Sequence, residues 1–266
     1  HEAMSRSARR RAPATEAAPA PLDLDAWRAE HARAHAQGMQ RGFVAATTLA
    51  RRALGAPSDD PGLAKDPRDL ELPPWNKGRY GTAIGRAVHA TLQTVDIGTG
   101  RGVDDTAAAQ AAAEGVEGHE ATIAALVRSA IAGPSVRRAV ECPHWREAYV
   151  AVMVDGITLE GYVDLLYRDD DGLVIVDYKT DTVGPDERAT RAAKYRVQLG
   201  AYALAVAEAT GERVVRATLV FCDPGGAAEI EFAGPELAAA MSEARSLARR
   251  ERDDPSPVPG PAAAEL

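Results

Sequence analysis

Three runs of β-branched and aromatic residues in the middle of the chain constrain its fold more than any other feature. In chain order they read AYVAVMV, ITLEGYVDLLY and LVIVDYKT. Asp155-Gly156 separates the first run from the second, and the Asp- and Gly-rich segment 168–172 separates the second from the third. Because both separators are strong turn signals, we expect three consecutive antiparallel strands.

Sequence typical of helices flanks these strands on both sides. Before them, apolar residues recur at intervals of three and four over residues 84–95, and residues 104–131 form an Ala-rich helical stretch. After them we expect a helix over about residues 186–210, a strand VVRATLVFC and a last helix over about 235–250. The predicted fold class is therefore α/β: a central mixed sheet, made of an antiparallel meander and a further strand, flanked by helices.

The two ends of the chain lack the patterns of a folded core. Residues 5–22 are rich in Arg, Ala and Pro without an apolar period, which is typical of a linker. A helix capped by Asp23 or Asp25 is expected to run through Trp27 to about Gln40, ahead of the apolar segment FVAATTLARRAL. The Pro-rich end, PSPVPGPAAAEL, is expected to be disordered. Because the first residue is His1 and the first methionine is Met4, we expect a fragment of a longer polypeptide.

Charge and cysteine content argue against several classes of protein. A formal net charge of −8 is unlike that of proteins that coat nucleic acid by general electrostatics. Cys142 and Cys222 are too few for a disulfide framework, a four-thiolate zinc site or an iron–sulfur cluster. No run approaches the roughly 18 apolar residues of a membrane span, and the first residues lack the apolar stretch of a signal peptide. We therefore expect a cytoplasmic location, no membrane contact and no iron–sulfur cluster.

Charged side chains converge in the second hairpin. If Tyr167 pairs with Val174 across the turn, Asp164 falls opposite Asp177, with Cβ atoms roughly 5 Å apart on one face. Lys179 lies two residues beyond Asp177 and so points to that face. Like charges so placed are destabilising unless a cation lies between them, and oxygen ligands with open positions suit Mg²⁺ or Mn²⁺. The lysine can then orient or help to deprotonate a water that attacks a phosphodiester.

The alternative is a solvated sheet face on which Lys179 relieves the repulsion between two surface carboxylates. Against this, Leu165, Leu166 and residues 174–176 make the two strands almost continuously apolar, as central buried strands are. Unpaired acids would be costly in such strands. The active-site interpretation is therefore favoured.

These strands also resemble the motifs of a known family. GYVDLLY followed by LVIVDYKT is similar to the Asp-bearing strand and the D-x-K strand of RecB-like PD-(D/E)XK nucleases, the domains at the C-terminus of AddA-, RecB- and UvrD-type helicase-nucleases. YRVQLGAYALA resembles the family's Y-x-x-Q-x-x-x-Y helix, with Tyr195, Gln198 and Tyr202. GTAIGRAVHATLQ resembles its G-x-x-x-H helix, which places His89. The four blocks occur in family order over roughly residues 80–222.

The resemblance implies a restriction-endonuclease-like core and a role for each matching residue. The implied metal ligands, for Mg²⁺ or Mn²⁺, are His89, Asp164, Asp177 and the main-chain carbonyl of Tyr178. Lys179 would be catalytic, and Gln198 and Tyr202, one helical turn apart, would help to hold the active site and DNA.

Three of the candidate residues also have a plainer interpretation. Taken alone, His89 lies beside the apolar stripe of its helix, where a histidine is more often structural. Tyr202 could equally be a helix-packing residue. Glu147, at the start of the first strand, could add a carboxylate to the site, although an ordinary strand-end charge is the favoured interpretation.

The function implied by the resemblance is metal-dependent hydrolysis of DNA. The substrate would be single strands or duplex ends, cut by an exonuclease during double-strand-break repair or recombination. A helicase motor would lie in the same polypeptide or in a partner subunit, because these residues hold no G-x-x-x-x-G-K-[ST] loop. Residues 1–45 would then connect a preceding helicase region to a nuclease domain at 46–252, followed by a disordered Pro-rich tail at 253–266.

Three alternatives to this function remain open. A purely structural interaction domain would bind no divalent metal. A stand-alone nuclease of the same fold would start at Met4 and lack helicase sequence upstream. A catalytically inactive DNA-binding or scaffold module would lack the triad, yet Asp164, Asp177 and Lys179 are all present.

Overall fold

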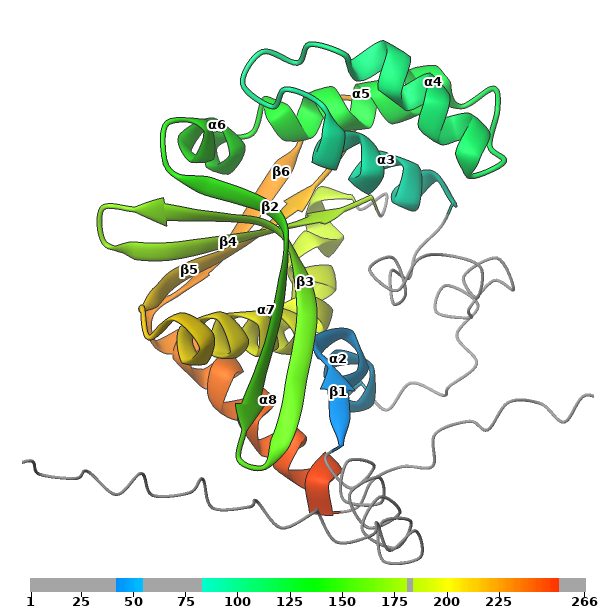
Figure 1. Cartoon of the computed structure of the whole chain (residues 1–266). Coiled ribbons are helices and arrows are strands. Elements are labelled where there is room, and N and C mark those ends of the chain that lie inside the picture. The colour runs from blue at the N-terminus through cyan, green and yellow to red at the C-terminus, as the bar shows by residue number, and fades with distance from the viewer. Residues whose placement is uncertain (1–41, 55–82, 181–183, 254–266) are drawn as a thin grey trace, which may run out of the picture. The chain divides into compact units, whose positions relative to one another are not determined.

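A six-stranded mixed sheet with helices on both faces forms the centre of the computed structural model (Figure 1). The structure describes residues 42–54, 83–180 and 184–253, all within one compact unit, Arg41–Leu266. The elements before the meander are β1 (Phe43–Ala45), α2 (Ala46–Ala53), α3 (Ala83–Thr94), α4 (Val103–Ala113), α5 (Glu120–Ile131) and α6 (Pro134–Val140). They are followed by β2 (His144–Val154), β3 (Ile157–Asp169), β4 (Gly172–Lys179), η3 (Pro185–Glu187), α7 (Arg188–Thr210), β5 (Val214–Phe221), β6 (Ala228–Ala233) and α8 (Gly234–Asp253).

The long strand β3 joins the parts of the sheet. It pairs antiparallel with β2 from Ile157 to Tyr167. On its other edge, the first part of β3 pairs parallel with β1 and the last part pairs antiparallel with β4. β4 runs parallel to β5, and β5 runs antiparallel to β6. The predicted α/β fold, with a meander and a further strand in one mixed sheet, is therefore confirmed.

Three local features differ from the sequence-based expectation. β1 has only three residues and β6 reads AEIEFA, so neither shows a strong strand pattern. The Ala-rich stretch 104–131 contains two helices, because Gly115 and Gly118 lie between α4 and α5 at φ values of 66° and 92°. Pro134 then opens α6, a helix that the sequence did not indicate.

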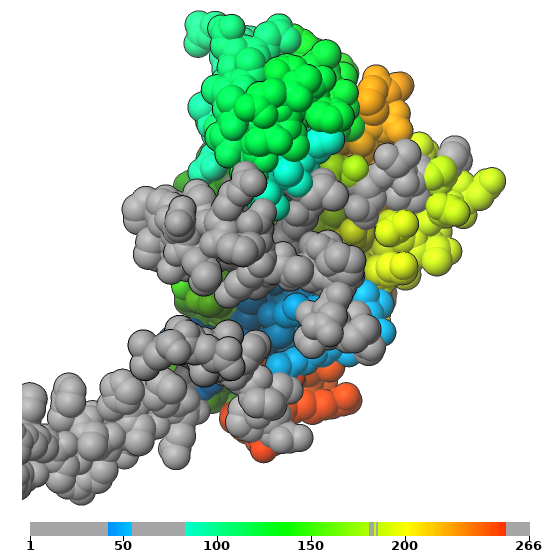
Figure 2. All heavy atoms as spheres, turned by 90° about the vertical axis from the view of Figure 1, so that its right-hand side faces the viewer, coloured from blue at the N-terminus to red at the C-terminus, as the bar shows by residue number. Residues whose placement is uncertain are grey.

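Apolar side chains build one core on each face of the sheet. The first core packs α2, α7 and α8 against the sheet, and the second packs α3 to α6 against the other face. In the side view, α2 and the group α3 to α5 occupy separate parts of one surface (Figure 2). α7 crosses α8 so closely that a Cβ on Gly200 would lie 2.3 Å from the carbonyl oxygen of Ala240. This close crossing fixes the position of α7, the helix that carries Gln198 and Tyr202.

Several expectations fall on parts of the chain outside the described residues. These are the linker at 5–22, the helix from Trp27 to Gln40 and the Pro-rich end. Within the described ranges, no helix combines the length and apolar character needed to cross a bilayer.

Candidate active site

The pairing of β3 with β4 has the predicted register. Tyr167 lies opposite Val174, and the ladder continues in step as far as Leu165. The same register places Asp164 opposite Asp177, one position beyond the last pair of the ladder. A hydrogen bond from main chain to side chain joins the two strands at this point: the N–H of Tyr178 donates to Asp164 Oδ2 at 2.8 Å.

β3 changes the direction of its side chains at Asp164. Val163 packs in the core beneath α7, whereas Leu165 packs in the core beneath α3 to α6. In a regular strand, residues two positions apart share a face. On β2 the residue opposite Asp164 is Glu147, whose φ of 52° is uncommon for a non-glycine residue, and the β2–β3 ladder is interrupted at this pair. Distortions of this kind often aim side chains at functional sites.

Three potential metal ligands meet at this distortion. His89, on α3, and the carboxylates of Glu147 and Asp164 each offer one ligand atom, and these atoms lie within 4.8 Å of one another. His89 Nδ1 lies 3.2 Å from Asp164 Oδ1. The imidazole also packs edge-on against Tyr178, with ring centroids 6.1 Å apart. One imidazole and two carboxylates are a donor set that fits a divalent cation such as Mn²⁺ or Mg²⁺.

Asp177, Lys179 and Gln198 form the other half of the site. Lys179 Nζ lies 2.6 Å from Asp177 Oδ2 and donates to Gln198 Oε1 at 3.3 Å. The Gln198 amide donates to Asp177 Oδ1 at 3.4 Å and to the hydroxyl of Tyr202 at 3.1 Å. The Asp177 side chain is only 4% exposed. The fold therefore holds a carboxylate and an ammonium in an interior network in which each group limits the movement of the others.

Two aromatic rings complete this half of the site. Lys179 Nζ lies over the ring of Tyr195, 4.3 Å from its centroid. The ring of Tyr202 lies against Gly161 of β3, where a Cβ would approach Tyr202 Cε1 to 2.5 Å. A glycine three residues before Asp164 thus makes room for the tyrosine of α7.

The pKa values of the two aspartates of the site are shifted in opposite directions. Burial alone would raise the pKa of Asp164, but His89, Lys179 and the Tyr178 N–H outweigh it and hold this pKa below its usual value. Burial raises the pKa of Asp177, and the nearby Asp164 adds to the shift despite the opposing charge of Lys179. The carboxylates compete for limited positive charge, a condition that a bound cation would relieve.

The negative charge of Asp164 also shifts the pKa of His89. Burial alone would lower the pKa of His89, but the charge and the hydrogen bond of Asp164 outweigh that effect, so its pKa lies above the usual value. The neighbouring Tyr178 and Tyr202 have pKa values raised well above normal, mainly by burial, and both stay neutral phenols.

The structure brings together all of the residues that the sequence indicated for the site. They come from four elements: His89 from α3, Asp164 from β3, Asp177, Tyr178 and Lys179 from β4, and Gln198 and Tyr202 from α7. The N–H and C=O of one residue leave an extended strand on the same side, so the carbonyl of Tyr178 also faces β3. Asp177 is not in the three-residue donor group and makes its shortest charged contact with Lys179.

Glu147, for which the sequence favours an ordinary strand-end charge, lies in the donor group with His89 and Asp164. A signal for it was present, because the Asp155-Gly156 turn sets the β2–β3 register. Counting back from Val154 opposite Ile157 places Glu147 opposite Asp164. Extending both hairpin registers, and not only the second, would have put three carboxylates at one place.

The chain is similar to large helicase/nuclease proteins from bacteria. It is 33% identical over 174 residues to an ATP-dependent helicase/nuclease protein of Desulforudis audaxviator, and the match covers 58% of this chain. The protein of the same name from Anoxybacillus flavithermus is 29% identical over 178 residues, or 61% of this chain. In both cases the match spans only 14% of the relative's length.

A solved structure and a family model complete the comparison. A protein from Eubacterium rectale, provisionally classed as an exonuclease, superposes with a TM-score of 0.50 over 86% of this chain and 84% of its own. The two are 11% identical, so this likeness shows the fold alone. A model of the PD-(D/E)XK nuclease superfamily matches residues 67–260, a range that contains all the site residues described above. With that match, the mixed sheet and the four motif blocks in their expected places, this chain belongs to the PD-(D/E)XK nuclease superfamily as a RecB-like domain.

Proposed function

We propose that this domain hydrolyses phosphodiester bonds of DNA in a reaction that depends on Mg²⁺ or Mn²⁺. One observation carries the proposal: His89 of α3, Glu147 of β2 and Asp164 of β3 form a donor group, and Asp177 and Lys179 form a buried pair on the neighbouring strand β4. A cation site and an oriented ammonium are the two features that phosphodiester hydrolysis at such a site requires.

The residues that would hold the cation are His89, Asp164, Asp177 and the carbonyl of Tyr178. Glu147 is a further ligand that the geometry offers. A divalent cation bound there supplies positive charge that offsets the charge of the phosphate and lowers the pKa of water.

Lys179 is the side chain that would act on the reacting group. Asp177, Gln198 and the ring of Tyr195 hold its ammonium before any substrate binds. From this position it would orient the attacking water and stabilise the negative charge that develops on the phosphate. Gln198 would act as a positioning residue, because it binds both Asp177 and Lys179. Tyr202 holds Gln198 in turn.

The similarity to helicase/nuclease proteins supports a wider proposal for this domain. We propose that the domain is an exonuclease fed by a helicase motor, in the same polypeptide or in a partner subunit, during double-strand-break repair in the cytoplasm. Residues 1–45 would form the connection, 46–252 the nuclease domain and 253–266 a tail. Attachment to a motor that already holds DNA raises the local DNA concentration, which would offset the unfavourable net charge of −8.

A nuclease assay with matched variants tests the proposal. The purified chain should degrade end-labelled single- or double-stranded DNA when Mg²⁺ or Mn²⁺ is present, and EDTA should stop it. Asp177→Asn should abolish the activity, whereas Asp169→Asn, which alters a carboxylate outside the site, should not. A folded wild-type chain that binds DNA but never cuts it would instead indicate an inactive DNA-binding module.

A further inference from the structure

Two tyrosines lie directly beside the donor group on the β2–β3 hairpin. Tyr149 and Tyr162 are opposite each other in the ladder, and their ring centroids are 5.0 Å apart. Tyr149 lies two positions after Glu147, and Tyr162 lies two positions before Asp164. Because a strand rises about 3.3 Å per residue, the tyrosine pair lies roughly 7 Å along the hairpin from the donor group.

The ring of Tyr149 is exposed but held in place. The residue is 55% exposed, an unusual setting for a large ring that normally contributes to a core. Its hydroxyl donates a 2.8 Å hydrogen bond to Glu160 Oε2. This bond, with a smaller effect of burial, raises the pKa of Tyr149 to about 12, so the ring stays uncharged. The hairpin thus presents an exposed, neutral ring at Tyr149 that is held by Glu160 and is tilted by 44° from the ring of Tyr162.

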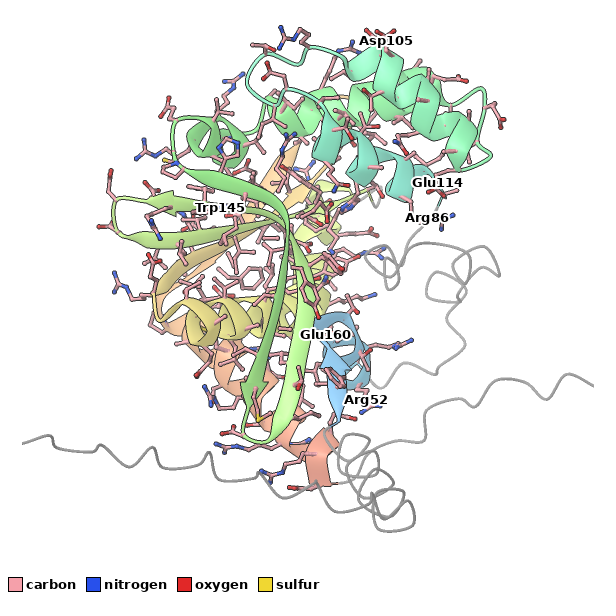
Figure 3. The ribbon with its side chains drawn as sticks, viewed as in Figure 1. Arg52, Arg86, Asp105, Glu114, Trp145 and Glu160 are labelled. Atoms are coloured by element: carbon pink, nitrogen blue, oxygen red, sulfur yellow. The ribbon has the colours of Figure 1, made fainter. Side chains whose placement is uncertain are left out.

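The surroundings of the pair favour a base over a phosphate. Ala151 and Met153 continue the exposed side of β2 beyond Tyr149, and both are apolar. The carboxylate of Glu160 lies beside the ring and would repel a phosphate group. Glu160 is visible on the lower part of β3 beside α2 (Figure 3). Stacking on a ring needs no positive charge, which suits a chain with a net charge of −8.

We infer that Tyr149 and Tyr162 form a stacking platform for a nucleobase of single-stranded DNA next to the bond that is cut. The inference rests on the proposed nuclease function. The base of a nucleotide whose phosphate lies at the donor group would be within reach of the tyrosine pair, because the pair is two strand positions from Glu147 and Asp164. Every base has a flat π face, so the platform tolerates any sequence. Bases paired in a duplex are already stacked and are not free to lie on it, so the platform selects single strands.

The test measures base stacking separately from cleavage. The 266-residue chain is titrated, with Ca²⁺ in place of Mg²⁺ to prevent cutting, into an oligothymidine that carries one 2-aminopurine. The fluorescence of 2-aminopurine falls when the base stacks on an aromatic ring, and anisotropy of an end label gives the affinity. Tyr149→Ala should weaken binding about tenfold and abolish the quenching, since stacking on one ring contributes that much per base. Tyr149→Phe, which keeps the ring, should retain both.

Trp145→Ala provides the matched control on the same strand. Trp145 is 44% exposed and packs against Arg168. It lies near the start of β2, away from Glu160 on β3 (Figure 3). Its removal should change neither affinity nor quenching.

The outcomes separate this inference from the proposed function. If wild type cuts DNA but Tyr149→Ala, still folded, binds and quenches as wild type does, the platform is wrong and the nuclease proposal stands. If Trp145→Ala weakens binding as much as Tyr149→Ala, the effect is not specific to the pair, and the platform is again wrong. A wild-type chain that neither cuts nor binds the oligonucleotide overturns both.

Discussion

The two ends of the β3–β4 hairpin hold acidic residues in opposite settings. Near the turn, Asp169 accepts a 2.8 Å hydrogen bond from Arg138 Nη2 on one oxygen and a 2.7 Å bond from Arg216 Nη2 on the other. The hydrogen bond from Arg138, with help from the Asp170 N–H and both arginine charges, holds the pKa of Asp169 below its usual value. The two arginines therefore offset the negative charge of Asp169 without a bound cation.

At the open end, three carboxylates of the described residues lie close to one another. Glu147, Asp164 and Asp177 share the region with Lys179 and His89, and the pKa of Asp177 is raised by burial and by Asp164. An acid that the fold neutralises by itself can be purely structural. A buried carboxylate whose pKa is raised by burial and by a neighbouring carboxylate, as that of Asp177 is, instead indicates a place for a cation. The contrast therefore predicts unequal effects of the same kind of substitution at the two ends.

The largest effect is expected from Asp164→Ala. This change removes a member of the donor group and the partner of His89, so divalent-cation binding should be lost. Cleavage should fall by more than about a thousandfold, because a catalytic cation contributes several kcal/mol to the transition state. Calorimetry with Mn²⁺ and a gel-based nuclease assay give the two readouts. Wild-type Mn²⁺ affinity in the variant would mean that the open end is not the cation site.

Lys179→Ala should separate chemistry from cation binding. Loss of one preorganised stabilising group typically lowers the rate by about a hundredfold to a thousandfold. Cation affinity should survive, because the ammonium is not a ligand, and the melting temperature should show that the variant is folded. Near-normal cleavage in a folded, cation-loaded variant would remove the lysine from the mechanism.

Gly161→Ala tests how tightly the open end is packed. The new Cβ would approach Tyr202 Cε1 to 2.5 Å, so the ring or the strand must move. Such overpacking costs about 1–3 kcal/mol, which a shift in the urea midpoint would measure. Gly184→Ala is the matched control, because its φ is −61° and a Cβ there meets no atom within 4 Å. Equal stability of the two variants would mean that Tyr202 can move away freely.

The central strands could be predicted, and the candidate site residues could be located on them, because the signals are local. The Asp-Gly turns and the alternation of the strands set the register, which then placed Asp164 opposite Asp177. The helix motif indicated Gln198 and Tyr202, and in the structure the amide of Gln198 donates to Asp177 and to the hydroxyl of Tyr202.

The features that were missed depend on tertiary contacts. β1 is three residues long and exists because β3 offers it a partner edge. Glu147 can be placed opposite Asp164 from the hairpin register, but its place beside His89 depends on how α3 packs on the sheet. No sequence pattern indicates the exposed ring of Tyr149, because its proposed role depends on Tyr162, which lies opposite it on β3.

The smallest effect is expected from Asp169→Asn, at the neutralised end of the hairpin. The carboxylate is 15% exposed, and Arg138 and Arg216 are 39% and 32% exposed, so solvent screens the pairs. Removing the charge should lower the free energy of unfolding at pH 7 by about 0–1 kcal/mol, as for other surface ion pairs. DNA cleavage and Mn²⁺ affinity should equal those of wild type.

The pH dependence of this variant gives a sharper readout. Because the pKa of Asp169 is lower in the folded chain than in the unfolded chain, its contribution is complete above the unfolded value of about 3.9 and is lost as the pH falls through the folded value. The difference in urea midpoint between wild type and Asp169→Asn should therefore be constant from pH 7 to about pH 5 and vanish in stronger acid. A difference that grows on acidification would mean that the arginines do not stabilise the ionised form. A folded Asp169→Asn variant that fails to cut DNA would remove the contrast between the two ends, because a carboxylate neutralised within the fold would then be as essential as those at the donor group.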